Sequence, residues 1–125
     1  MLKKVAIVVG SQDSGKSTTI NKHLKPKLGI KEKAYLFWKK QGYVMSQSIE
    51  ESNINLDSLL KKCIDKKFVV LAARPDNERR TELTLFTKIL KENGFDVKPF
   101  TLKERTDNHQ NIQSDEIVAY FEKEI

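Results

Sequence analysis

Two short apolar runs constrain the fold of this chain more than any other feature of its sequence. They occupy residues 5–9 and 68–73, and no polar residue interrupts either of them. Runs of this length and kind are typical of strands that are buried on both faces of a parallel sheet. Helices must cover both faces of such a sheet. The two runs therefore predict an α/β fold with a mostly parallel central sheet.

The rest of the chain supplies the helices that this sheet needs. Apolar residues recur three and four positions apart, as they do on one face of an amphipathic helix. This spacing is found in three stretches, residues 56–64, 83–90 and 114–125. Asn53 or Asn55 could cap the first of these helices, and Cys63 lies on its apolar stripe. A further parallel strand is expected over residues 95–102.

Two aromatic-rich runs, residues 34–38 and 43–48, are expected to form an antiparallel hairpin, because Gly42 ends the short polar stretch between them. We expect this hairpin at one edge of the sheet. The alternation of strands and helices over 125 residues predicts a single domain, 1–125, folded as a three-layer α/β sandwich. The polar stretch 103–113 is expected to be a long surface loop before the last helix.

A glycine-rich segment joins the first strand to the helix that follows it. Its sequence from Gly10 to Ser17, GSQDSGKS, matches G-x-x-x-x-G-K-[ST] at every fixed position. Glycines permit a backbone path on which successive N–H groups form a nest for an anion at a helix N-terminus. The Lys16 ammonium can then reach the β and γ phosphates of a nucleotide, and the Ser17 hydroxyl can bind Mg²⁺. The helix is expected to run to about Leu24 and to stop before Pro26.

Through Gly10, Gly15, Lys16 and Ser17 the chain resembles the P-loop nucleoside triphosphate hydrolase superfamily. It further resembles the small kinase-like branch of that superfamily through Arg74, Arg79 and Arg80, which follow the second apolar run. The resemblance implies a P-loop type of sandwich, Mg-ATP or Mg-GTP as ligand, and phosphoryl transfer or hydrolysis. We expect ATP rather than GTP, because residues 21–24 lack the aspartate of a guanine-reading motif. The residues that the resemblance implies for nucleotide binding are Gly10, Ser11, Gln12, Asp13, Ser14, Gly15, Lys16, Ser17 and Thr18.

The second buried strand departs from the pattern of that superfamily. A Walker B strand normally ends in an acidic residue that holds magnesium, whereas residues 68–73 are followed by Arg74, and Asp76 comes two residues later. Asp76 is a candidate magnesium ligand beside Ser17, with a turn or capping role as the alternative. In the small kinase branch an arginine after a core strand closes over the phosphates. Arg74 is therefore a candidate catalytic residue together with Lys16.

Several other side chains have two interpretations each. Arg79 and Arg80 either contact phosphates or are solvated helix residues, and Glu50 and Glu51 are either candidates for a general base or surface charges. Aromatic rings in the hairpin either stack against a base or acceptor or cover the core. These rings belong to Tyr35, Phe37, Trp38 and Tyr43.

Composition narrows the setting and the partners. The chain has 23 Lys and Arg against 17 Asp and Glu, a net charge of +6, which makes attraction to phosphates or nucleic acid plausible without being specific to either. No apolar run is long enough to span a membrane, and no membrane partner is expected. The single cysteine, Cys63, excludes an intramolecular disulfide framework and favours the cytoplasm.

Taken together, these residues predict a Mg-dependent protein that binds a nucleoside triphosphate and acts as a small kinase or NTPase on an unknown phosphate acceptor. Two other functions stay open. One is a nucleotide-binding module without catalytic turnover, and the other is a protein that couples nucleotide binding to nucleic-acid binding.

Overall fold

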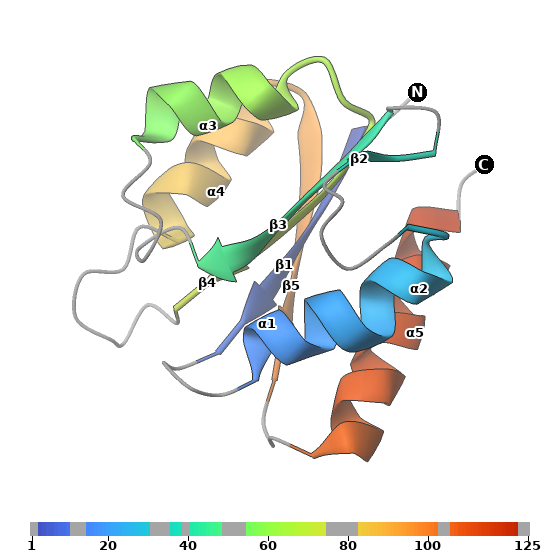
Figure 1. Cartoon of the computed structure of the whole chain (residues 1–125). Coiled ribbons are helices and arrows are strands. Elements are labelled where there is room, and N and C mark those ends of the chain that lie inside the picture. The colour runs from blue at the N-terminus through green and yellow to red at the C-terminus, as the bar shows by residue number, and fades with distance from the viewer. Residues whose placement is uncertain are drawn as a thin grey trace.

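The computed structural model describes residues 3–10, 15–30, 36–38, 41–48, 55–74, 83–102 and 106–122. Within this part of the chain a five-stranded sheet has the order β2-β3-β4-β1-β5 (Figure 1). Four of the strands are mutually parallel, and β2 pairs antiparallel with β3. Their bounds are β1 (Lys3–Val9), β2 (Leu36–Phe37), β3 (Gly42–Ser48), β4 (Phe68–Ala73) and β5 (Phe95–Thr101).

Helices cover both faces of the sheet, as in a three-layer sandwich (Figure 1). One layer contains the consecutive helices that follow β1, together with the C-terminal helix, and the other layer contains the two helices from the middle of the chain. The first layer consists of α1 (Lys16–Thr18), the π-helix η1 (Thr19–Leu24), α2 (Lys25–Lys27) and α5 (Asp107–Glu122). The second consists of α3 (Leu56–Cys63) and α4 (Leu83–Glu92). The predicted α/β class with a mostly parallel sheet is confirmed.

The core forms on both sides of β1 and β4, because alternate side chains of each strand point to opposite layers. In β1, Ala6 and Val8 pack toward η1 and α5, whereas Val5 and Ile7 pack toward α3 and α4. All six residues of β4 are buried. Each fully buried aliphatic side chain contributes about 1.5–3 kcal/mol of hydrophobic stabilisation. The two apolar runs thus occupy the centre of the sheet, as their composition predicts.

The helix start and the buried stripe of α3 match the sequence prediction. Asn55 caps the helix, and its Oδ1 accepts a hydrogen bond from the Ser58 N–H at 2.8 Å. Cys63 and Leu59 are fully buried against the sheet. The local pattern was sufficient here because the capping side chain and the apolar stripe lie within the same few residues.

The helix after β1 extends further than predicted. Pro26 was expected beyond its end, but the helical segment continues through η1 into α2 and ends at Lys27. The η1 turn changes the hydrogen-bond register, since the Lys25 N–H donates to the Ile20 carbonyl five residues back. Pro26 then lies in the first turn of α2, where a missing N–H is tolerated.

The C-terminal helix begins well before the predicted start at Ser114. It runs from Asp107, so most of the stretch expected to be a surface loop is helical. The Thr106 hydroxyl caps it by accepting the His109 N–H at 3.2 Å. The prediction was wrong because Gln110 and Gln113, which are polar, form the buried face of the first half of the helix. Apolar periodicity cannot detect such a face.

The predicted hairpin corresponds to β2 and β3. Leu36 pairs with Tyr43 and Phe37 with Gly42, both antiparallel, while β3 also pairs in parallel with β4. Lys39 and Lys40, in the connection between the two strands, lie outside the described residues. The complete hairpin therefore stays a prediction. Of its two strands, β2 lies at the edge of the sheet and β3 is an inner strand.

Candidate functional site

The topology singles out one position at the carboxyl ends of the strands. The helices after β1 lie in the η1–α5 layer, whereas α4, after β4, lies in the opposite layer (Figure 1). These two strands are direct neighbours in the sheet. In open α/β sheets, ligands bind at the carboxyl ends of neighbouring strands whose connections leave toward opposite layers. The segment from Gly10 to Ser17 starts at this position, directly after β1.

Backbone hydrogen bonds attach the end of β1 to both neighbouring strands. The Gly10 N–H donates to the Ala73 carbonyl of β4 at 3.1 Å. On the other side, the Leu102 N–H, just after β5, donates to the Val9 carbonyl at 2.8 Å. The start of the glycine-rich segment is therefore anchored on both sides.

Gly15 closes the same segment and begins the helix. Its φ of 96° and ψ of 17° lie in the left-handed region, which glycine adopts without the steric cost that a Cβ imposes. Gly15 has no side chain to cap the helix, whose first helical residue is Lys16. The N-terminal turn therefore presents its backbone without a capping side chain from that position.

Lys16 connects the two ends of the segment. Its ammonium donates to the Gly10 carbonyl at 2.6 Å, and only 6% of the residue is exposed. Burying an ammonium is costly unless oxygen atoms replace its water shell. The carbonyl directly after β1 supplies one such oxygen, and it places the positive charge at the carboxyl end of that strand.

Thr19 is a site residue that the sequence analysis did not identify. It is fully buried, and both its backbone N–H and its hydroxyl donate to the Gly15 carbonyl, each at 2.9 Å. A threonine four positions after a glycine at a helix start was the available signal, because its hydroxyl can reach the carbonyl one turn back.

The other predicted residues are placed as follows. Ser17 is exposed and Thr18 is half-buried in the first helical turn, and Arg74 is half-buried directly after β4, next to the Ala73 carbonyl that binds Gly10. The structure thus brings Gly10, Lys16 and the strand end that carries Arg74 together. Outside the described residues lie Ser11, Gln12, Asp13, Ser14, Glu50, Glu51, Asp76, Arg79 and Arg80.

The aromatic side chain of Trp38 lies at the other end of the sheet. Its ring contacts Phe68, the first residue of β4, at 4.8 Å between centroids in an edge-to-face arrangement, and Phe121 at 6.1 Å. Tyr43 is half-buried and packs against the cluster that α3 and α4 cover. Of the two interpretations of these rings, core packing is the one that the contacts support. The side chains of Tyr35 and Phe37 lie outside the described part.

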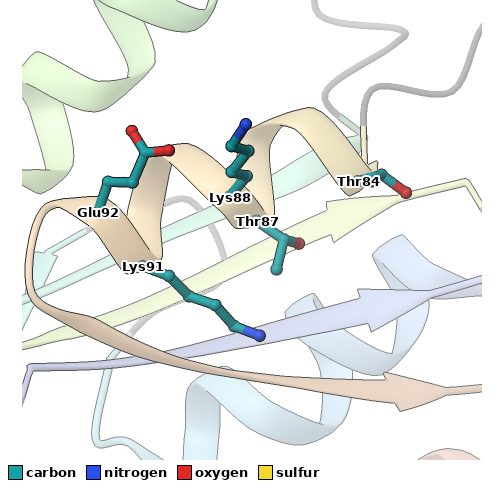
Figure 2. Close-up of a pocket in the computed structure, with 5 residues that line it drawn as sticks. All are labelled: Thr84, Thr87, Lys88, Lys91 and Glu92. Atoms are coloured by element: carbon teal, nitrogen blue, oxygen red, sulfur yellow. The ribbon is translucent and has the colours of Figure 1, made fainter.

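A hollow of about 500 Å³ lies along α4, away from the glycine-rich segment (Figure 2). The lining residues that belong to the described part of the chain all lie on that helix, and Figure 2 shows Lys88 and Glu92 directed to one side of the helix and Thr87 and Lys91 to the other. Four of the five lining residues are exposed. The hollow is therefore an open surface feature. Its lining residues are Thr84, Thr87, Lys88, Lys91 and Glu92.

Two absences hold for the described residues alone. They contain no group of three or more His, Cys, Asp or Glu side chains that could hold a metal ion. None of their helices has the length and apolar character needed to cross a membrane.

Comparisons of the chain with family models, with curated proteins and with solved structures found no match.

Proposed function

We propose that this protein binds a Mg-nucleoside triphosphate, ATP in preference to GTP, with its phosphates between the ends of β1 and β4. The observation that carries the proposal is the buried Lys16 ammonium, which donates to the carbonyl at the end of β1 and lies at the start of the following helix. The eight-residue G-x-x-x-x-G-K-S match supports it independently, because that spacing is what phosphate binding requires.

The helix start suits a phosphate group. Gly15 contributes no capping side chain, so phosphate oxygens can accept hydrogen bonds from the N–H groups of the first turn, where a serine or aspartate does so in other helices. The Gly10 carbonyl carries only a partial negative charge, whereas a triphosphate is fully anionic. A bond from Lys16 to a phosphate oxygen is therefore the stronger of the two.

The donor set at the helix start fits Mg²⁺ as part of a nucleotide complex. Mg²⁺ takes one or two protein ligands and fills the rest of its octahedron with phosphate oxygens and water. The Ser17 hydroxyl would be one protein ligand, and Asp76 is the candidate for a second. When bound, the ion would withdraw negative charge from the β and γ phosphates, which assists phosphoryl transfer.

The chemistry that follows is that of a small kinase or NTPase. Lys16 stabilises the negative charge on the transferred group, and Arg74, placed directly after β4, contributes a second cation from the facing strand. The assignment to the P-loop type of fold, with an antiparallel hairpin at the sheet edge, is part of the same proposal. The phosphate acceptor stays unidentified.

Calorimetry on the native chain and on Lys16→Ala tests the proposal. We expect Mg-ATP to bind more tightly than Mg-GTP, and we expect Lys16→Ala to weaken binding by about 10- to 100-fold, because a charged hydrogen bond is lost. Lys22→Ala is the matched control, since Lys22 is an exposed lysine on the same helical segment. Absence of binding to either nucleotide by the native chain would refute the proposal.

A nucleotide-binding module without turnover is the second candidate. The observation in its favour is the end of β4, where Ala73 is followed by Arg74 and not by a magnesium-binding acid. Phosphate release in the calorimetry samples separates the two candidates. A kinase or NTPase releases or transfers phosphate at a rate that Lys16→Ala abolishes, and a module binds nucleotide without releasing phosphate.

A further inference from the structure

The carbonyl group of Gly15 is held at one geometry by two donors from a single residue. The backbone N–H and the hydroxyl of Thr19 both donate to it, each at 2.9 Å, in surroundings that exclude solvent from Thr19 completely. A β-branched side chain has few accessible χ1 rotamers in a helix, so the hydroxyl stays in place with little further loss of entropy. Gly15, in contrast, is the residue with the greatest backbone freedom in this turn.

Fixing this carbonyl also fixes the orientation of the Lys16 N–H group, which belongs to the same peptide unit. The peptide unit between Gly15 and Lys16 is planar and trans, so its N–H points away from its carbonyl. The Gly15 carbonyl points along the helix toward Thr19. The Lys16 N–H therefore points in the opposite direction, out of the helix start, where the phosphates are proposed to bind.

The helix changes its register immediately after this turn. Thr19 is the first residue of η1, and one turn later the Lys25 N–H bonds five residues back, to Ile20. The Thr19 N–H still bonds four residues back, to Gly15. The Thr19 hydroxyl donates a second hydrogen bond to the Gly15 carbonyl, four residues back. Thr19 is also the residue at which the α-helix changes into the π-helix η1. The second hydrogen bond stabilises the α-helical start against extension of the π-helical register toward Lys16.

We propose that Thr19 is a positioning residue for phosphate binding: its hydroxyl holds the Gly15–Lys16 peptide in the orientation that presents the Lys16 N–H to the ligand. This inference rests on the proposed function, because it concerns the same site. It predicts that the hydroxyl affects affinity for the triphosphate group itself and not only the stability of the fold.

The test compares Thr19→Val, which keeps the branched shape and loses the hydroxyl, with Thr19→Ser, which keeps the hydroxyl. Affinity is measured by calorimetry for Mg-ATP and for inorganic triphosphate, at a temperature at which circular dichroism shows each variant folded. We expect Thr19→Val to bind both ligands roughly three- to tenfold more weakly than the native chain, the effect of one lost hydrogen bond. We expect Thr19→Ser to restore most of the affinity.

Ser114→Ala is the matched control. The Ser114 hydroxyl is also buried and donates to a helix carbonyl, that of Asn111 at 2.7 Å, but it lies in α5. Its loss is expected to lower stability and to leave both affinities unchanged. If Ser114→Ala weakens binding as much as Thr19→Val, the effect is general and the inference is overturned.

The remaining outcomes separate the inference from the proposed function. If Lys16→Ala abolishes binding and a folded Thr19→Val binds as tightly as the native chain, the inference fails and the proposed function stands. If the native chain binds neither ligand, both fail. If Thr19→Val does not fold, the affinities of Thr19→Ser and Thr19→Ala are compared instead, because these two variants differ by the hydroxyl alone. Weaker binding by Thr19→Ala supports the inference, and equal binding overturns it.

Discussion

Among single residues, Cys63 has a strongly perturbed ionisation. It is fully buried on α3, and this burial raises the pKa of its thiol from 9.0 to about 12. Nearby Lys66 and Lys62 oppose the shift, and burial outweighs them because a thiolate inside the core loses its hydration. The thiol is therefore expected to be unreactive in the folded protein, since the thiolate is the nucleophile.

This shift predicts how stability changes in alkali. Between pH 9 and pH 12 the unfolded chain has lost the Cys63 proton and the folded chain retains it. The folded state then binds more protons, so the free energy of unfolding falls as pH rises, by at most about 1.4 kcal/mol per pH unit from this group. Below pH 9 the contribution of the Cys63 thiol to the free energy of unfolding does not change with pH.

Urea unfolding of the native chain and of Cys63→Ala at several pH values between 8 and about 11 checks this prediction. The variant is less stable at every pH because it leaves a cavity. The difference between the two proteins should shrink as pH rises above 9. A constant difference would show that the thiol does not titrate as the structure indicates.

At the scale of elements, one lysine joins α2 to α5. The Lys27 ammonium lies within hydrogen-bond distance of four oxygen atoms on α5: the Asn111 carbonyl at 3.0 Å, Asn111 Oδ1 at 2.7 Å, Ser114 Oγ at 2.6 Å and Asp115 Oδ1 at 2.8 Å. Asp115 lies in the middle of α5 and pairs with Lys27.

Replacement of Lys27 by methionine is expected to lower the free energy of unfolding by about 1–3 kcal/mol, because the charged hydrogen bonds are lost while the aliphatic stem is kept. Chemical denaturation measures the change. Lys22→Met is the control, since Lys22 is exposed on η1 and should cost close to nothing. Equal stability of the two variants would show that the contacts between Lys27 and α5 do not stabilise the fold.

Elements were predictable where their signal is local. The bounds of β4 coincide with its apolar run, and α3 starts at its Asn55 cap. The start of α5 and the continuation through Pro26 were missed for a different reason. Gln110 and Gln113 are buried in the structure, where α5 packs against η1, and the π turn before Pro26 arises within a packed helix. Neither feature produces a periodic pattern of apolar residues in the sequence.

At the scale of the whole molecule, the single tryptophan reports on packing between distant parts of the chain. Trp38 contacts Phe68 of β4 and Phe121 of α5. If the domain unfolds as one unit, loss of Trp38 fluorescence and loss of helical circular dichroism should coincide in denaturant. Separate midpoints would show that the edge of the sheet unfolds independently.

Ligand binding should also stabilise the whole domain, because the proposed site joins β1, β4 and the helix after β1. At a Mg-ATP concentration of about 100 times the dissociation constant, we expect a gain of about 2.7 kcal/mol in the free energy of unfolding. Circular dichroism with and without Mg-ATP measures it. In Lys16→Ala tested at the same concentration the gain should fall to about 0.4–1.4 kcal/mol, because binding that is 10- to 100-fold weaker leaves the ligand at about 1 to 10 times the dissociation constant of the variant. A gain of equal size in that variant would place the ligand elsewhere.

Charge is distributed unevenly over the described helices. The α5 segment contains acidic residues and no lysine or arginine, whereas Lys88 and Lys91 are exposed on α4. A coupled nucleic-acid partner has only the net charge of +6 in its favour and stays a prediction.

Local sequence was enough to predict the α/β class, the two central strands and the cap of α3, because strand burial and helix capping act over a few neighbouring positions. Three-dimensional packing settled the sheet order, the hydrogen bond between Gly10 and Ala73, the burial of Lys16 and the two hydrogen bonds from Thr19 to the Gly15 carbonyl. These features depend on which surfaces meet when distant segments pack. The residue pattern within one segment does not determine which surfaces of distant segments will meet.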